Sequence, residues 1–176
     1  IFSDSRYIMI SNNVLVVLTC LLLTLRVCCA SQEWDCDNTT TTGTFARSND
    51  CTIQGSDHIL VSNILEIEGS NKDMNNLVTI TAANGKRHFA INEANAKLIL
   101  RYIKLSGGDV SGGSSNDATG YGGSILVNKN NGAAGELNLY SSIIDNNKAY
   151  RGGGIFSYGT VKIDGNSIIR NNEASN

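Results

Sequence analysis

Proline is absent from this chain of 176 residues, aromatic residues make up only 6% of it, and charged residues only 17%. The formal net charge of −2 gives no basis for binding nucleic acid or an anionic membrane surface. Disorder would require fewer aliphatic residues and a larger net charge than the chain has. Turns must therefore come from its 18 glycines and 22 asparagines, and this mixture favours many tight turns around an aliphatic core.

A short apolar run lies near the N-terminus. Residues 14–25, VLVVLTCLLLTL, are too few to span a bilayer, which takes about 20 residues, but they fit the core of a signal peptide. Cleavage after Ala30 would follow a small residue. We therefore predict a signal helix and peptide over 1–30, with 1–8 lying upstream of the true start. An uncleaved signal anchor is the alternative, because Arg26 directly after the apolar run is unusual.

Secretion changes how the cysteines are interpreted. Removal of the signal peptide leaves Cys36 and Cys51, which are 15 residues apart and are predicted to form a disulfide in an oxidising compartment. A metal site would need further ligands nearby, and His58 and His88 lie on separate segments. The sequence therefore predicts neither a metal nor a cofactor.

The two cysteines bracket a threonine-rich segment. We expect residues 31–52 to form an N-terminal entry and capping segment held by the disulfide. Asn38 begins an Asn-Thr-Thr sequence, which is a predicted N-glycosylation site. The remaining residues, 53–176, form the repeat region.

Short β-type runs recur in this region as triplets, separated by turns rich in glycine and asparagine. The triplets are Ile59–Val61, Leu65–Ile67 and Val78–Ile80; Phe89–Ile91, Leu98–Leu100 and Ile103–Leu105; Ile125–Val127, Leu137–Leu139 and 143–144; and 155–156, Val161–Ile163 and 168–169. Variable turns between constant strands predict an all-β fold, a right-handed single-stranded parallel β-helix of about three to four rungs. An antiparallel sandwich, the rival fold, does not predict equivalent residues at a recurring spacing.

The repetition is clearest at the C-terminal end of the chain. A step of 25 residues aligns Asn146 and Asn147 with Asn171 and Asn172, so that their side chains can stack amide on amide. The same step pairs Ile143 with Ile168, Ile144 with Ile169, Asp145 with Arg170, and Lys148 with Glu173. We expect one continuous core from Leu98, Leu100, Leu137, Leu139, Ile143, Val161, Ile163 and Ile168.

Two short motifs accompany each of the later triplets. Gly122 and Gly123 precede Ile125, and Gly153 and Gly154 precede Ile155. Each triplet then ends on an asparagine motif, Ile-Asp-Asn-Asn or Ile-Arg-Asn-Asn. This combination resembles the polymorphic outer membrane protein repeats, which alternate Gly-Gly-Ala-Ile with Phe-x-x-Asn. The resemblance covers about half of the chain and implies a surface-exposed or secreted β-helix associated with adhesion; it carries over no catalytic residue.

Pectate lyases and polygalacturonases resemble this architecture, so an enzymatic function is the alternative. Such enzymes need clustered carboxylates, whereas Asp109, Asp117, Asp145 and Asp164 are scattered along the sequence. A row of aromatic residues could also bind sugars, and the candidates are Tyr140, Tyr150 and Tyr158, although their spacing differs from the 25-residue step.

The sequence thus predicts a secreted or cell-surface protein with a structural or adhesive role and glycans or cell-surface proteins as partners. No membrane span is predicted in the mature chain. The alternative is the N-terminal part of a polysaccharide lyase or glycoside hydrolase of β-helix fold. Because no capping element follows Ile169, we also expect the β-helix to be truncated and the native protein to continue with further rungs.

Overall fold

The structure is a computed structural model that describes residues 32–36, 41–55, 58–114, 118–130 and 133–176. These residues form short β-strands and no helix, and therefore no helix long and apolar enough to cross a membrane. The predicted signal peptide, 1–30, and the predicted glycosylation site, Asn38, lie outside the described residues.

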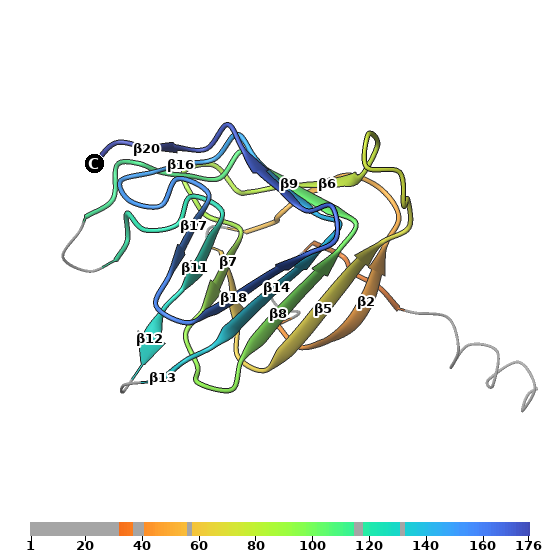
Figure 1. The fold of residues 1–176 in the computed structure, drawn as a ribbon, viewed down its shortest axis with the longest axis horizontal. Helices are drawn as coiled ribbons and strands as arrows, with labels where there is room; N and C mark the ends of the chain where they lie inside the picture. The colour runs from red at the N-terminus through yellow and green to blue at the C-terminus, as the bar shows by residue number, and fades with distance from the viewer. Residues whose placement is uncertain (1–31, 37–40, 56–57, 115–117, 131–132) are drawn as a thin grey trace, which may run out of the picture. The chain divides into compact units, whose positions relative to one another are not determined.

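The strands assemble mainly into parallel sheets (Figure 1). The six-stranded sheet has the order β1 (Gln32–Glu33), β2 (Gly43–Arg47), β5 (Ile64–Gly69), β8 (Lys97–Arg101), β14 (Glu136–Tyr140), β18 (Thr160–Asp164). The five-stranded sheet has the order β19 (Ile168–Arg170), β15 (Ile143–Asp145), β9 (Ile103–Ser106), β6 (Val78–Thr81), β3 (Cys51–Thr52). The four-stranded sheet has the order β17 (Ile155–Ser157), β11 (Ile125–Val127), β7 (Phe89–Ile91), β4 (Ile59–Val61).

Two smaller groups complete the fold. One is a three-stranded sheet of β10 (Asp109–Val110), β16 (Lys148–Ala149) and β20 (Glu173–Ala174). The other is the antiparallel pair β12 (Lys129–Asn130) and β13 (Ala133–Ala134). Every other strand pair is parallel, so the antiparallel sandwich is wrong for the described residues.

The register matches the alignment expected from the sequence. Ile143 pairs with Ile168, Ile144 with Ile169, Asp145 with Arg170, and Lys148 with Glu173, and all of these pairs are confirmed. Each main sheet takes one strand from each triplet. The structure also extends the sheets into the entry segment, because β2 pairs with β5 and β3 with β6.

Alternating aliphatic residues place the core between the main sheets. Leu65, Leu98 and Leu137 align across the six-stranded sheet and are fully buried, as are Ile67, Leu100 and Leu139 two positions along. A strand buries every second side chain on one face, so the pattern of the sequence fixes which residues point inward.

Three of the predicted core positions need correction. Ile163 is 52% and Ile168 38% exposed, although both have the predicted register, because β18 and β19 are the last strands of their sheets. Ile143 is buried, but it aligns with Lys104 on the outward side of its sheet, and Ile144 belongs to the core cluster instead. Two adjacent isoleucines give no alternation, so the sequence alone did not decide between them.

The paired asparagines perform two different tasks. Asn146 and Asn171 have φ of 55° and 53°, the left-handed conformation that asparagine tolerates better than most residues. Asn147 and Asn172 stack instead: Asn147 Nδ2 donates to Asn172 Oδ1 over 2.9 Å, and Asn172 Nδ2 donates to the Ile144 carbonyl over 2.9 Å. Asn147 Oδ1 also accepts from the backbone N–H of Gly108 over 2.9 Å.

Replacing Asn147 with alanine is therefore expected to lower the free energy of unfolding by ~2 kcal/mol, because buried backbone groups lose their partners. Asn146→Gly is the matched control, since glycine adopts the left-handed conformation at no steric cost. Urea unfolding of both variants would check this. Equal losses in the two variants would contradict the different roles assigned to the two asparagines.

The glycine motifs serve both turning and close approach. Gly122 and Gly152 have φ of 65° and 61°. A Cβ atom on Gly123 would collide with the carbonyl oxygen of Gly153, and one on Gly154 would approach the Asn172 side-chain nitrogen to 2.9 Å. The repeated glycines thus let neighbouring segments pass closely before Ile125 and Ile155.

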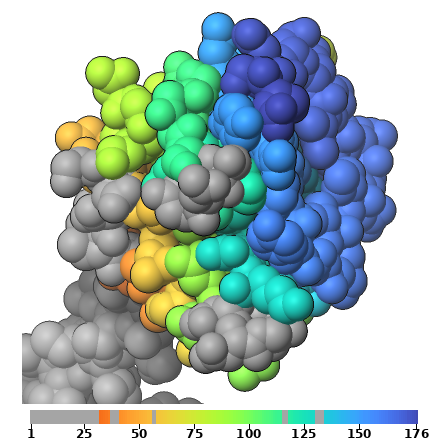
Figure 2. Space-filling model, turned by 90° about the vertical axis from the view of Figure 1, so that its left-hand side faces the viewer, coloured from red at the N-terminus to blue at the C-terminus, as the bar shows by residue number. Residues whose placement is uncertain are grey.

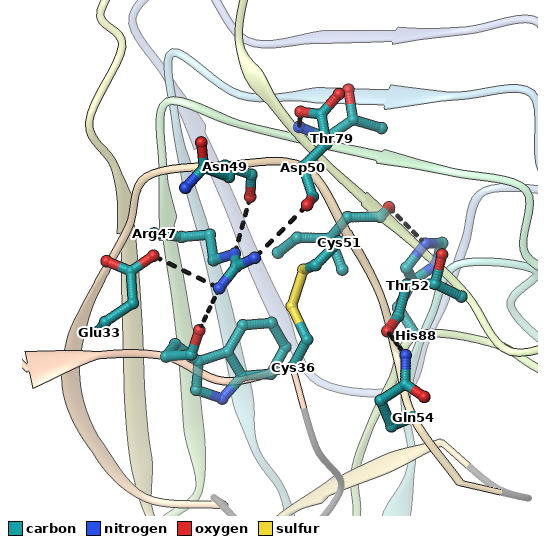
Figure 3. Close-up of a disulfide and its surroundings, with 12 residues drawn as sticks. Glu33, Cys36, Arg47, Asn49, Asp50, Cys51, Thr52, Gln54, Thr79 and His88 are labelled. Carbon is teal, nitrogen blue, oxygen red and sulfur yellow. Dashed lines mark hydrogen bonds and ion pairs between the residues drawn. A yellow bond between two sulfur atoms is a disulfide. The ribbon is translucent and has the colours of Figure 1, made fainter.

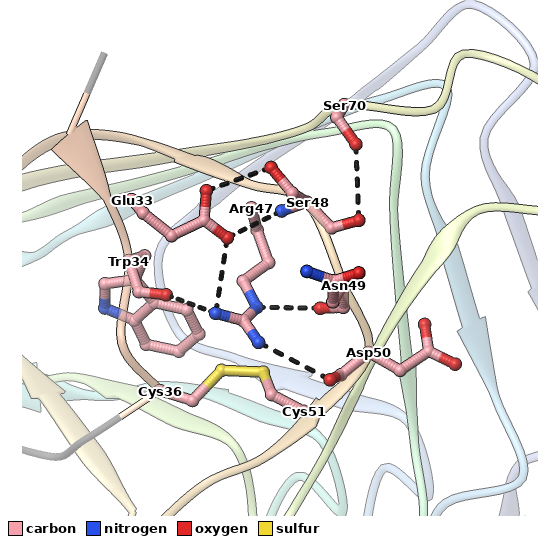
Figure 4. Close-up of polar contacts among 9 residues, drawn as sticks. All are labelled: Glu33, Trp34, Cys36, Arg47, Ser48, Asn49, Asp50, Cys51 and Ser70. Carbon is pink, nitrogen blue, oxygen red and sulfur yellow. Dashed lines mark hydrogen bonds and ion pairs between the residues drawn. A yellow bond between two sulfur atoms is a disulfide. The ribbon is translucent and has the colours of Figure 1, made fainter. Parts of the chain in front are cut away.

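A compact cluster covers the core near the N-terminal end of the described chain. Trp34 is fully buried, and its ring centroid lies 6.1 Å from that of Phe89. Arg47 donates to the carbonyl oxygens of Trp34 and Asn49, each over 2.7 Å, and lies 3.4 Å from the Glu33 carboxylate (Figure 4). These bonds fix the segment that carries the tryptophan.

The same segment is joined covalently to the sheets. The structure contains the Cys36–Cys51 disulfide, which links the residues after β1 to β3 (Figure 3). Next to it, the Asp50 carboxylate accepts from the backbone N–H of Thr79 over 2.7 Å. The disulfide and this hydrogen bond both connect the entry segment to later strands.

Replacing Cys36 and Cys51 by serine is expected to lower the free energy of unfolding by ~3 kcal/mol, the chain-entropy value for a loop of this length. Urea unfolding would measure the loss. Reduced wild-type protein serves as the control and should be destabilised to the same extent. A loss in the serine variant below ~1 kcal/mol would show that the bond does not hold the segment.

Candidate binding surface

The outward side of the four-stranded sheet is apolar. Leu60, Ala90, Leu126 and Phe156 occupy aligned positions on β4, β7, β11 and β17. The matching outward row of the six-stranded sheet is more polar and consists of Glu66, Ile99, Asn138 and Lys162. Figure 2 looks onto the apolar side, where blue residues of the late strands border the teal residues that precede them.

Aromatic residues extend this apolar row into a continuous band. We call Tyr121, Tyr150, Arg151, Phe156 and Tyr158 the aromatic strip. The ring centroids of Tyr121 and Phe156 lie 4.3 Å apart, and those of Phe156 and Tyr158 lie 5.1 Å apart in an edge-on arrangement. The guanidinium carbon of Arg151 lies 5.7 Å from the Tyr121 centroid and 5.8 Å from that of Tyr150.

The pairing of neighbouring segments builds the strip. Tyr121 and Arg151 are bridge partners, and Leu126 and Phe156 are register partners, so residues 30 apart in sequence come side by side. Tyr121 is 5% exposed and packs with Ala90 and Leu126, whereas Tyr158 is 54% exposed. The strip therefore has a packed base and accessible rings above it.

The sequence predicted this surface only in part. Tyr150 and Tyr158 belong to the strip, but Tyr140 lies in the six-stranded sheet, where its ring is 4.1 Å from the Arg101 guanidinium. Tyr121 and Phe156 were missed because the strip follows a 30-residue step. Aligning the two Gly-Gly motifs, rather than the asparagine motifs, would have revealed that step.

A polar groove runs along the outward side of the five-stranded sheet. Its volume is about 320 Å³. It is lined by Asp50, Met74, Asn75, Asn76, Leu77, Thr79, Lys104, Ile143, Ile168 and Arg170. Beside it, the Asp145 carboxylate lies 3.4 Å from Lys104 and 3.5 Å from Arg170. The groove thus combines an apolar floor with amide and charged groups.

The carboxylates are held in the ionised form. Burial would raise the pKa of Asp145, but hydrogen bonds from Asn171, Arg170 and Lys104 outweigh burial and lower it. Hydrogen bonds from Lys162 and Asn138 lower the pKa of Glu136 to about 2. A general acid needs a raised pKa, so neither residue is tuned for that role.

A second cavity of about 590 Å³ adjoins the glycine-rich insertion 106–122. Asp109 in this cavity accepts from the backbone N–H and the hydroxyl of Ser111, and these bonds lower its pKa. Arg87 donates to the carbonyl oxygens of Ala118 and Thr119 over 3.1 and 2.7 Å. These contacts fix the insertion, and the described residues contain no group of three or more His, Cys, Asp or Glu placed to hold a metal ion.

Comparison with known proteins adds no assignment. No protein-family model, no curated protein and no solved structure matches this chain. The functional argument therefore rests on the faces of the molecule described above.

Proposed function

We propose that this protein is a secreted or cell-surface right-handed parallel β-helix with a structural and adhesive role, in which each strand triplet is one rung. Parallel strands in successive sheets support the coiled arrangement. The hand follows from the strong preference of parallel crossover connections for the right-handed form. The Cys36–Cys51 disulfide favours an oxidising compartment.

The aromatic strip is the observation that carries the adhesive role. Accessible aromatic rings on the outside of a rigid sheet supply contact area at little cost in conformational entropy. Elsewhere the outward rows carry ion pairs, such as Arg101 with Glu66 at 2.6 Å and Lys162 with Glu136 at 2.9 Å. The likeness of the glycine and asparagine motifs to polymorphic outer membrane protein repeats supports the same role.

A glycan array probed with wild-type protein and with Phe156→Ala/Tyr158→Ala tests this proposal. We expect the wild type to bind a subset of glycans and the double variant to lose that binding. Tyr140→Ala is the matched control, because it removes an aromatic residue from a different sheet. Binding that survives in the double variant, or that is confined to deglycosylated cell-surface proteins, would contradict adhesion to glycans through the strip.

The polar groove favours a second candidate, the N-terminal part of a polysaccharide lyase or glycoside hydrolase. An elongated groove across neighbouring strands suits a polymer, and Asp50 and Lys104 line it. Incubating the protein with pectate and with other plant and microbial polysaccharides, followed by a reducing-end assay, tests this candidate. We expect no cleavage, because Asp145 is kept ionised by its cationic partners.

A further inference from the structure

Contacts within the aromatic strip arrange its members in a definite order. Tyr158 contacts Phe156, Phe156 contacts Tyr121, and the Arg151 guanidinium lies over both Tyr121 and Tyr150. An aromatic surface therefore leads to a single cation. A pyranose ring has one face of C–H groups that packs on aromatic rings, and its hydroxyls remain at the rim where water or polar groups can reach them.

The cation in the strip is held ready for an acceptor. Contacts with two rings orient the guanidinium, and Nη1 lies 3.4 Å from the Tyr121 hydroxyl. With the Asn176 amide oriented to satisfy both partners, its oxygen accepts from Arg151 Nε over 2.9 Å and from Nη2 over 3.2 Å. A neutral amide oxygen thus occupies the two-donor edge of the guanidinium.

A carboxylate is a better ligand for that edge than an amide. It matches the guanidinium with two parallel hydrogen bonds, and charge-assisted bonds are roughly twice as strong as neutral ones. Asn176 is exposed, so displacing its side chain into water costs little. The preference would be local to Arg151, because the net charge of −2 provides no general attraction for anions.

We infer that the aromatic strip binds carboxylated polysaccharides, with sugar rings packed on Phe156 and Tyr158 and a sugar carboxylate paired with Arg151. This inference rests on the proposed adhesive function and names the ligand class of the same surface. Arg151 acts as the residue that determines specificity, and the aromatic rings supply most of the contact.

Calorimetric titration of the whole protein with oligogalacturonate and with a cello-oligosaccharide of equal length tests the inference. The wild type is expected to bind the carboxylated oligomer about tenfold more tightly, as one charge-assisted pair would give. Tyr158→Ala should weaken binding of both oligomers. Arg151→Gln should abolish the preference while retaining binding of the uncharged oligomer, and Arg151→Lys should restore only part of it because lysine lacks the planar fork.

The outcomes separate this inference from the proposed function. If the wild type binds both oligomers equally, or if Arg151→Gln keeps the preference, the inference is wrong and glycan adhesion stands. If the wild type binds neither these oligomers nor any glycan on the array, the proposed function fails as well. Thermal unfolding of each variant should match the wild type, since Arg151 and Tyr158 are both exposed.

Discussion

Replacing Trp34 with alanine is expected to lower the free energy of unfolding by about 3–5 kcal/mol, the usual cost of removing a buried tryptophan from a core. The indole is fully buried against Phe89 and covers the inward side chains at this end of the described sheets. The segment that carries it is fixed by Arg47 and by the disulfide, so it cannot easily collapse into the space left behind. Equilibrium unfolding in urea would give the difference in free energy.

Leu60→Ala is the matched control for this substitution. Leu60 is also a large apolar residue, but it is 44% exposed on the outward side of the four-stranded sheet. Its loss is expected to cost well under half as much as the loss of Trp34. If Trp34→Ala were no more destabilising than Leu60→Ala, Trp34 would not be part of the folding core.

The second large effect concerns pH and His88. This histidine is fully buried, and its Nε2 lies 3.0 Å from the Ile80 carbonyl and 3.1 Å from that of Ser106. Its Nδ1 lies 3.1 Å from the Ser124 hydroxyl, so one neutral ring connects three segments. Burial lowers the pKa of His88 from 6.5 to about 4, although the two carbonyl contacts oppose this shift.

The lowered pKa predicts that stability falls as the pH drops. The unfolded chain takes up the proton near pH 6.5 but the folded protein only near pH 4, so the stabilisation is complete above 6.5 and is lost progressively between these values. We expect the free energy of unfolding to be about 2 kcal/mol lower at pH 5 than at pH 7.5. The carboxylates with lowered pKa, such as Asp145, add their own losses only at lower pH.

His88→Gln should flatten this dependence between pH 7.5 and 5, because glutamine can keep a hydrogen bond but does not titrate in that range. His58→Gln serves as the control, since His58 is only half-buried, and should leave the slope as in the wild type. Urea unfolding at several pH values measures all three proteins. An unchanged slope in His88→Gln would assign the pH dependence to other groups.

The sequence predicted the strands better than it predicted the surfaces. Alternating leucines such as Leu98 and Leu100 can bury only one face, so their inward direction followed from pattern alone. The isoleucine pair 143–144 lacks alternation, and only the pairing of Ile144 with Leu105 shows which one points inward. The first strands, β1 to β3, are short and polar in part, so they gave no comparable signal.

The aromatic strip was hard to predict for a different reason. Tyr121, Tyr150 and Arg151 lie in turns, where no periodicity connects a residue with its spatial neighbour. Their approach depends on the 30-residue step between the Gly-Gly motifs, whereas the asparagine motifs recur after 25 residues. Insertions of different length in different turns thus decide which side chains meet on the outside.

The central claim is that segments 24 to 36 residues apart lie side by side in a fixed parallel register, and paired cysteines test it most directly. Asn138 and Lys162 are partners on the outward side of β14 and β18. Oxidation of Asn138→Cys/Lys162→Cys should give a rapid intramolecular disulfide, detected by mass spectrometry of the tryptic peptides. The shifted pair Asn138→Cys/Ile163→Cys places the two side chains on opposite faces and should react slowly. A crosslink that forms equally well in both variants, or in neither, would contradict the register on which the core and the aromatic strip depend.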